Sequence, residues 1–567
     1  MLIALIVAGG VLETLSIGLV IPALAVMTQP DVGARYPAIG VWLSRLGNPT
    51  QNQLIVAGMT LLVVMYLFKT IVLGGLAWRQ ARFAFGLQAA LSERVFSAYL
   101  RQPYSFHLQR NSAELINTAV SKVAGIAGVL QQSFMFIAET LVMAGISVML
   151  FAVEPLGASL AVSVLAIAGW GFSRATRGRI LRWGKAYQAH EEKRIQHLQQ
   201  GLGGVKDAKL LGREDEFLAQ YRADNLGSAR AGELQGTLIA LPRLGLELLA
   251  MIGLATLALT MLSQGAAPET MLPRLGLFAA AAFRLMPSVV RIIGGVQGVR
   301  YLMPVIDTLH KELRAMEASV ELRTDHALPF GETLSLAGVS YRYPQSSLLA
   351  LNDVSLSISR GSSVGIVGSS GAGKSTLVDI MLGLLAPTAG SVLVDGVDIQ
   401  GALRGWQNQI GYVPQTIFLT DDSLRCNVAF GVPVNQIDER AVEKAIQAAQ
   451  LEEFVASQPR GLDTSVGERG VRLSGGQRQR IGIARALYHE PSVLVLDEAT
   501  SALDTLTEQG VMDGVRAMQG EKTVIIVAHR LSSVQHCSHI YRLSHGKVIE
   551  QGPASSVLPG RDAMNHG

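Results

Sequence analysis

Residues 471–504 read VRLSGGQRQRIGIARALYHEPSVLVLDEATSALD. Within this stretch, Ser492–Glu498 is an apolar, β-branched run that ends in two acids, Asp497 and Glu498. Such a run is typical of a parallel strand that is buried on both faces. Doubly wound sheets bind their ligands at the carboxyl ends of their strands. The stretch therefore predicts an α/β domain with two carboxylates at the ligand-binding edge of its sheet.

A predicted phosphate-binding loop precedes this stretch. Residues 368–376 read GSSGAGKST, which fits the pattern G-x-x-x-x-G-K-[ST], and they follow a strand-like run at 363–367. Glycines let such a loop curl, and backbone N–H groups at the start of the next helix favour anions. We expect Lys374 to reach the β- and γ-phosphates, Ser375 to ligate Mg²⁺ and Asp497 to hold the ion through its water shell. The residues expected around the phosphates are Gly368, Ser369, Ser370, Gly371, Ala372, Gly373, Lys374, Ser375 and Thr376.

The residues between these two pieces carry a family resemblance. Residues 473–477 read LSGGQ, and the motifs DEAT and SALD follow. With these motifs, residues 332–555 resemble the nucleotide-binding domain of ABC transporters. The resemblance implies an ATP hydrolase coupled to transport, with ATP and Mg²⁺ as its cofactors.

The resemblance also implies roles for single residues. Glu498 would polarise the attacking water as a general base. Gln415 would contact both Mg²⁺ and that water, and His529, which follows the SALD motif at the family spacing, would contact the γ-phosphate. Tyr343 resembles the aromatic residue that stacks on adenine, although a tyrosine at a strand end can also simply fill the core.

The LSGGQ residues imply a partner. Ser474, Gly475, Gly476 and Gln477 begin a predicted helix, and in the family such residues bind the nucleotide of the facing domain. One chain is then half of the transporter. The simplest completion is a two-fold homodimer with two composite ATP sites; a heterodimer with a separate half-transporter is the alternative.

The other half of the chain is predicted to lie in a membrane. Of the 567 residues, 49% are hydrophobic and 16% charged, with a mean hydropathy of +0.32, which is unusual for a soluble enzyme. Roughly 20 apolar residues suffice to span a bilayer. The apolar runs that predict six spans lie at about 1–28, 54–78, 124–152, 156–173, 240–263 and 272–299. A secretory signal peptide is disfavoured for the first run, because it has neither a basic start nor a small-residue cleavage site.

Positive charges predict the orientation of these spans. Arginines and lysines concentrate between the second and third spans and between the fourth and fifth. Because basic loops stay in the cytoplasm, we expect both loops and the ATPase domain there, with the protein in the inner membrane. The net charge of +4 is modest, and we expect no nucleic-acid partner.

Two spans continue into amphipathic extensions, Arg79–Leu100 and Arg174–Gln200, which must project into water as long helices. Turns follow near 102–112 and 201–217. In ABC exporters such turns are coupling helices that press on the nucleotide-binding domains, whereas the plain alternative is a helix-hairpin turn. The predicted fold class is therefore a membrane all-α domain of six transmembrane helices with long cytoplasmic extensions, followed by an α/β P-loop ABC ATPase domain. The predicted boundaries are 1–316 for the transmembrane domain, 317–331 for a linker and 332–567 for the ATPase domain.

Charged residues inside the spans are the candidates for cargo binding, because charges in a membrane are costly and usually face a cavity or a partner. Arg284 and Arg291 are seven residues apart and therefore share a helix face. With Lys69, they are candidates to bind an anionic headgroup such as a diphosphate, whose oxygens guanidinium groups match. The alternative is that they pair with Glu247 or Glu139 inside the bundle.

A second resemblance concerns the cargo. Glu13–Pro22 (ETLSIGLVIP) and Leu277–Arg291 (LFAAAAFRLMPSVVR) look like the lipid-linked oligosaccharide flippases of bacterial protein N-glycosylation. Those proteins carry a short external helix between the first two spans, for which Tyr36–Leu46 is the candidate here. The hypothesis is ATP-driven export or flipping of a polyprenyl-diphosphate glycan or a related anionic lipid. The alternative is a broad exporter of amphipathic small molecules or another lipid, and no feature of the sequence fixes the direction of transport.

Overall fold

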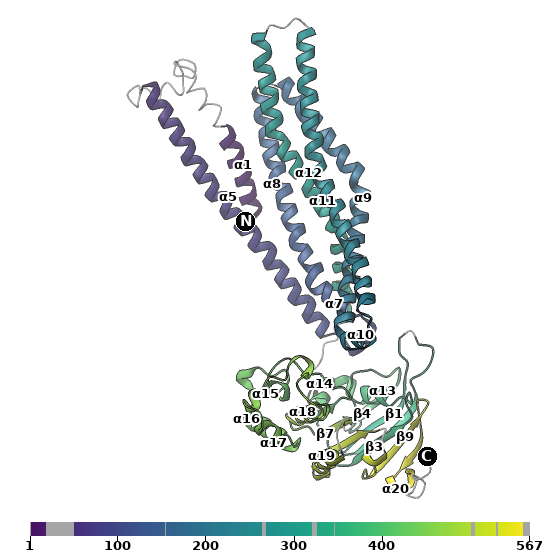
Figure 1. Ribbon diagram of the computed structural model, residues 1–567. Coiled ribbons are helices and arrows are strands. Elements are labelled where there is room, and N and C mark those ends of the chain that lie inside the picture. Colours follow the sequence, from purple (N-terminus) through teal and green to yellow (C-terminus); the bar gives the residue numbers. More distant parts are fainter. Residues whose placement is uncertain are drawn as a thin grey trace. The chain divides into compact units, whose positions relative to one another are not determined.

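The computed structural model describes residues 2–18, 50–153, 155–263, 268–319, 326–344, 346–499, 505–528 and 531–558. The chain forms two compact units (Figure 1). The first, here called the membrane unit, comprises residues 1–102 and 109–320. The second, here called the ATPase unit, comprises residues 103–108 and 321–567.

The membrane unit is built from long helices. Their bounds are α1 (Leu2–Gly18), α5 (Gln51–Leu100), α8 (Val123–Val153), α9 (Pro155–Gly203), α11 (Glu214–Ser263) and α12 (Pro268–Ser319). Short elements between them are α7 (Ser112–Asn117), the π-helix η1 (Thr118–Lys122) and α10 (Val205–Leu211). Helix α12 packs against α8, α9 and α11, whereas α1 packs against α5 and α8.

Four helices within the described residues are long and apolar enough to cross a membrane. They are Ile55–Leu100, Ser112–Ala152, Glu214–Ser263 and Leu285–Ala315. Helices α1 and α9 carry the other two predicted spans. The predicted extensions are confirmed, because α5 continues to Leu100 and α9 to Gly203. The end of the first predicted span and the candidate external helix Tyr36–Leu46 lie outside the described residues.

An apolar core joins four helices of the membrane unit. Its buried side chains are Val142, Ile146, Leu165, Leu246, Leu285, Val289 and Ile293, from α8, α9, α11 and α12. Other apolar side chains of the spans point outward, for example Leu61, Val63 and Leu67 of α5. An apolar exterior suits a helix whose solvent is lipid.

The ATPase unit contains two sheets. The larger has the strand order β10-β9-β3-β8-β7-β6 and the smaller β2-β1-β4-β5. The larger sheet consists of β3 (Ser363–Gly368), β6 (Ile410–Val413), β7 (Val493–Asp497), β8 (Thr523–Val527), β9 (His539–Ser544) and β10 (Lys547–Gly552). The smaller consists of β1 (Thr333–Tyr341), β2 (Leu351–Ser359), β4 (Ala389–Val394) and β5 (Val397–Asp398). The described α-helices of this unit are α13 (Lys374–Met381), α14 (Leu403–Gln407), α15 (Leu424–Val428), α16 (Glu439–Ala448), α17 (Glu452–Ala456), α18 (Gly475–Leu487), α19 (Thr505–Ala517) and α20 (Ala554–Val557). Helix α6 (Tyr104–Gln109) also belongs to it, except for its last residue, Gln109.

Burial along the strands follows their place in these sheets. Every residue of β7 and β8 is buried, as expected for parallel strands covered on both faces. Strand β2 instead alternates between buried and exposed residues, which is typical of an antiparallel strand with one face on the core. The fully apolar runs therefore mark the centre of the large sheet.

Part of the predicted linker belongs to the core of the ATPase unit. Leu328 and Phe330 are buried in that core, and the Phe330 ring lies 6.0 Å from the Trp406 ring, centroid to centroid. They alternate with the exposed residues Ala327, Pro329 and Gly331, so that every second side chain is buried just before β1 begins. Pro103–Leu108 also groups with the ATPase unit, although it is bounded on both sides by residues of the membrane unit.

Candidate active site

Parallel strands bring most of the predicted site residues to one edge of the large sheet. Strands β3, β8, β7 and β6 are neighbours and run parallel, so their carboxyl ends meet at the same edge. The phosphate loop follows β3, Asp497 ends β7, and Gln415 lies two residues after β6. Strand β8 ends two residues before His529 in the sequence, and His529 and the predicted motif 501–504 lie outside the described residues.

The phosphate loop depends on two glycines with positive φ. Gly371 has φ of 77° and Gly373 has φ of 101°, a region that other residues adopt only with strain. A Cβ at Gly373 would lie 2.7 Å from the Ala350 carbonyl oxygen. The loop therefore turns tightly into α13, with Lys374 as the first residue of that helix.

The side chain of Lys374 folds back over this loop. Its Nζ donates to the carbonyl oxygens of Gly368 at 2.8 Å and Ser369 at 2.9 Å. Burial lowers the pKa of Lys374, while Glu498 and Asp497 oppose that shift. The ammonium group is thus held against the loop where the loop and the start of α13 would receive an anion.

The two acids at the end of β7 lie in different environments. Asp497 is buried, whereas Glu498 has φ of 51° and donates its backbone N–H to the Val527 carbonyl at 3.0 Å. Gln415 Nε2 donates to Glu498 Oε2 at 2.7 Å, in an exposed position. The backbone therefore turns Glu498 away from the strand, and Gln415 holds its carboxylate at the surface of the site.

The predicted Mg²⁺ ligands supply the oxygen chemistry that this ion prefers. Ser375 is exposed in the first turn of α13, next to the buried Lys374. Asp497 ends the neighbouring strand, and Gln415 offers an amide oxygen, because its amide nitrogen is the atom bonded to Glu498. Hydroxyl, carboxylate and amide oxygens suit Mg²⁺. The residues present therefore fit the ion.

Two residues that the sequence analysis did not single out, Tyr412 and Asp379, also lie near Asp497. The Tyr412 hydroxyl donates to Asp497 Oδ2 at 3.4 Å, from the neighbouring strand β6. Burial, and then the charge of Asp497, raises the pKa of Asp379 on α13 to about 6. The available signal was the position of Tyr412 in the GYVPQ run beside Gln415 and of Asp379 one helical turn after Ser375.

Tyr343 lies two residues after β1 and is half-buried. Its hydroxyl is 3.1 Å from Thr376 Oγ1, and its ring meets that of Tyr341 edge-on with centroids 5.0 Å apart. The side chain is therefore tied to the helix that follows the phosphate loop. Its predicted role toward adenine and the alternative of a core tyrosine both fit this position.

The LSGGQ residues form a capped helix start. Ser474 is the N-cap of α18: its hydroxyl accepts from Gln477 N–H at 3.2 Å, and its own N–H donates to Gln477 Oε1 at 2.9 Å. Ser474 itself is exposed, and Gly475 and Gly476 occupy the first helical turn. Backbone N–H groups at such a helix start can bind an anion supplied from outside.

In the membrane unit, two of the three candidate cargo residues are ion-paired. Arg291 of α12 pairs with the buried Glu139 of α8, and Lys69 Nζ lies 3.7 Å from Glu13 Oε1. Arg291 nevertheless keeps half of its side chain exposed. The side chain of Arg284 lies outside the described residues.

A cavity of about 650 Å³ lies between α11 and α12. Arg291 lines it, together with Arg243 and Glu247, which form an ion pair at 2.8 Å. The rest of its wall is apolar and includes Met251, Leu254, Phe283, Met286 and Val290. The cavity can therefore accept a molecule with a large apolar part and a charged group.

Known proteins match the chain over most of its length. Residues 351–501 match the family described as ABC transporter, and residues 2–232 match the ABC transporter transmembrane region. A relative from Cupriavidus pinatubonensis named ATP-dependent lipid A-core flippase is 31% identical over 506 residues, which cover 84% of this chain and 83% of that protein. A relative of the same name from Burkholderia pseudomallei is 30% identical over 490 residues, covering 82% of this chain and 78% of that protein.

One solved structure matches almost the whole chain. It is described as the structure of a bacterial Atm1-family ABC exporter with ATP bound. The two align with a TM-score of 0.77 at 24% identity, over 96% of this chain and 95% of the other. The predicted fold class, a helical transmembrane domain followed by an α/β ATPase domain, is thereby confirmed.

Proposed function

Because the chain belongs to the ABC transporters that join a transmembrane region and an ATPase domain in one polypeptide, we propose that it flips or exports a phosphate-bearing glycolipid, specifically a polyprenyl-diphosphate-linked oligosaccharide. Its ATPase domain hydrolyses ATP, and hydrolysis drives transport. The observation that carries the lipid proposal is the cavity between α11 and α12, which is mostly apolar and is lined by Arg291 and by the ion pair of Arg243 with Glu247.

The chemistry of this cavity supports an amphipathic anion. Guanidinium groups match phosphate oxygens in geometry and charge, and the apolar wall suits a lipid chain. Arg291 already faces Glu139, so a diphosphate would have to share or displace that carboxylate. Arg284 and Lys69 are proposed to add positive charge along the path of the headgroup.

The proposed hydrolysis step uses the residues at the edge of the large sheet. Lys374 and the backbone of the phosphate loop hold the phosphates, and Tyr343 stacks on adenine. Glu498 accepts the proton of the attacking water as general base, with Gln415 and His529 orienting the water and the γ-phosphate. Mg²⁺, held by Ser375, Gln415 and the water shell of Asp497, would neutralise phosphate charge.

The proposed working form is a homodimer in the inner membrane, with the ATPase domains in the cytoplasm. The exposed start of α18 at Ser474 would bind the nucleotide of the partner subunit, so that each ATP lies between two chains. Native mass spectrometry tests this point: the proposal expects a particle of twice the 60.5 kDa chain. A particle of one chain that hydrolyses ATP at full rate would contradict it.

Transport of a defined lipid in proteoliposomes tests the cargo. The proposal expects ATP-dependent flipping of a polyprenyl-diphosphate glycan by the wild type. Flipping should be lost in Glu498→Gln and in the double variant Arg284→Ala with Arg291→Ala, of which only the second keeps ATP hydrolysis. A lipid A-core glycolipid serves as the competing cargo, because the relatives carry that name. If only the lipid A-core glycolipid is transported, the polyprenyl-diphosphate cargo is wrong, whereas the proposed class of phosphate-bearing glycolipids stands.

A broad exporter of amphipathic small molecules is the alternative function. The apolar share of the cavity wall favours it, since such a wall accepts many hydrophobic molecules. Removal of the arginines distinguishes the two functions. Export of a hydrophobic dye should survive that change, whereas flipping of a diphosphate lipid should not.

A further inference from the structure

The chain passes between its two units at three points, namely between residues 102 and 103, 108 and 109, and 320 and 321. The second point lies just before Arg110, at the end of α6, and the third lies just after α12 ends at Ser319. Within one chain, these are the covalent routes by which a movement of the ATPase unit reaches the membrane unit. Contacts that join two of these routes are therefore placed to transmit such a movement.

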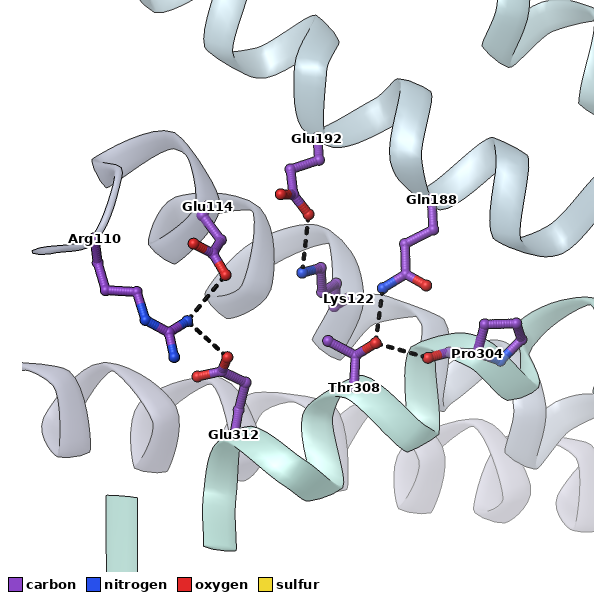
Figure 2. A network of polar contacts seen from close by, with 8 residues as sticks. All are labelled: Arg110, Glu114, Lys122, Gln188, Glu192, Pro304, Thr308 and Glu312. Atoms are coloured by element: carbon purple, nitrogen blue, oxygen red, sulfur yellow. Dashed lines mark hydrogen bonds and ion pairs between the residues drawn. The ribbon is translucent and has the colours of Figure 1, made fainter. Parts of the chain in front are cut away.

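One ion pair joins the second route to the third. Arg110 Nη1 donates to Glu312 Oε1 at 2.8 Å and to Glu114 Oε1 at 2.9 Å (Figure 2). Glu114 lies on α7, four residues after Arg110, so that this bond is local. Glu312 lies on α12, only 13% of its side chain is exposed, and the pair spans 202 residues of sequence.

The environment of Arg110 favours this long-range bond. Its side chain is itself only 31% exposed, and ion pairs screened from water are stronger than pairs at an open surface. The hydrogen bond to Glu312 is also the first cause of the raised pKa of the Arg110 guanidinium. The Arg110–Glu312 ion pair is therefore expected to be more stable than an ion pair between two fully exposed side chains.

Two further contacts close a triangle around this pair, and Figure 2 shows all of them. Lys122, the last residue of the π-helix η1, is buried and places its Nζ 3.3 Å from Glu192 Oε2 of α9. Gln188 of α9 donates to Thr308 Oγ1 of α12 at 3.0 Å. Segment 110–122, α9 and α12 are thus linked pairwise, so that a displacement of one is resisted by both others.

We propose that the Arg110–Glu312 ion pair couples the ATPase cycle to the cargo cavity by making α6 and α12 move together. Helix α12 is continuous from the cavity residue Arg291 to Glu312. These residues are separated by about 30 Å along the axis at the usual helical rise. A continuous helix of this length acts as a lever, so a shift imposed near Glu312 reaches the cavity wall. This inference rests on the proposed transport function, because it assumes that ATP changes access to the cavity.

A cargo-independent test measures that access directly. The parent carries Cys426→Ser, which removes the half-exposed native thiol, and Met251→Cys, which places a reporter thiol in the cavity wall. Glu498→Gln is added to trap ATP. The rate of maleimide labelling at position 251 is measured in lipid nanodiscs with and without ATP, while hydrolysis is measured in the same set of variants with Glu498 intact.

The expected results separate coupling from folding. Glu312→Gln should reduce the ATP-dependent change in labelling rate by about tenfold, within the usual range of coupling between sites, and should leave hydrolysis within about twofold of the parent. Glu114→Gln is the matched control, because it removes the same kind of bond from the same arginine, and it should label like the parent. On the Glu114→Gln background, Arg110→Glu should behave like Glu312→Gln, and adding Glu312→Arg should restore the response.

Two outcomes would overturn the inference. In one, Glu312→Gln keeps the full labelling response. In the other, Glu312→Gln loses hydrolysis and labelling together and the charge-exchanged variant recovers neither, so that the pair serves folding alone. A parent in which ATP leaves the labelling rate unchanged would contradict the proposed function instead, which keeps the two failures distinguishable.

Discussion

Exchange of Glu498 for glutamine removes a charge while preserving almost all of the local structure. The backbone bend at Glu498 is held by its own N–H, which bonds to the Val527 carbonyl at 3.0 Å. Its side-chain oxygen accepts from Gln415 Nε2 at 2.7 Å, and the amide oxygen of a glutamine can accept the same bond. The variant therefore tests proton acceptance by this side chain rather than the shape of the site.

The expected loss follows from the role proposed for the carboxylate. A positioned general base contributes about 10²- to 10⁴-fold to a rate, which is about 3 to 5.5 kcal/mol of activation free energy. ATP binding is proposed to depend on Lys374 and the phosphate loop, whose residues the exchange leaves in place. Glu498→Gln should thus lower kcat by that factor and leave KM nearly unchanged, as measured by phosphate release from protein in nanodiscs.

Gln415→Ala provides the comparison that makes this prediction sharp. It removes the bond to Glu498 but leaves the base, and because the bond is exposed, its worth is about 0.5 to 1.5 kcal/mol, or about 2- to 10-fold in rate. Saturating Mg²⁺ offsets any loss of an ion ligand. The reasoning is refuted if Glu498→Gln retains turnover within about tenfold of the wild type, or if Gln415→Ala loses as much as Glu498→Gln.

Three further predictions, two of them with a control substitution, test the geometry elsewhere. Gly373→Ala places a Cβ 2.7 Å from a carbonyl oxygen at φ of 101° and should weaken ATP binding and cost about 1–3 kcal/mol of stability. Gly371→Ala, which meets nothing within 4 Å, isolates the cost of positive φ. Burial raises the pKa of Asp379 from 3.8 to about 6, so the stability contributed by its proton is present below pH 3.8 and lost as pH rises toward 6. The free energy of unfolding of Asp379→Asn should therefore rise above that of the wild type between pH 3.8 and about 6. The difference should reach about 1–3 kcal/mol, after allowance for solvent screening, and persist at higher pH. Thermal unfolding at several pH values measures it. Glu139→Gln removes the carboxylate that pairs with Arg291 and should lower Tm more than Glu247→Gln. The reason is that Glu139 is buried, whereas both side chains of the Arg243–Glu247 pair are exposed.

The fold was predictable where local pattern and burial agree. The run VLVLD has four apolar residues followed by Asp497 at the ligand-binding edge, which predicts a buried strand. The structure agrees, because every residue of β7 is buried. Helices α5 and α9 were predictable for the same reason, since their apolar spans continue into amphipathic repeats until Pro103 ends the first and the glycines at 201–204 end the second. Both patterns are read from residues close together in the chain.

Contacts between distant residues were predictable only as alternatives. The pairing of Arg291 with Glu139 was one of two possibilities, because sequence spacing cannot show which acid of another helix faces an arginine. Tyr412 approaches Asp497 only because β6 and β7 are neighbours in the sheet. Leu328 and Phe330 were assigned to the linker because two apolar residues next to a polar stretch do not indicate a buried segment by themselves. Their burial follows from the distant residues of the ATPase core that they contact.

The surface of α10 bears on the proposed homodimer. Pro103–Leu108, which contains most of α6, groups with the ATPase unit of its own chain, whereas α10 belongs to the membrane unit. Leu210 and Leu211 of α10 are 82% and 69% exposed, in a segment predicted to face the cytoplasm, and apolar side chains at such a position suit a contact with another protein surface. In the proposed homodimer, we expect α10 to contact the partner subunit, and two-fold symmetry would repeat that contact on the other chain. The same symmetry would bring the nucleotide of the partner subunit to the start of α18 at Ser474, as the proposed composite ATP site requires.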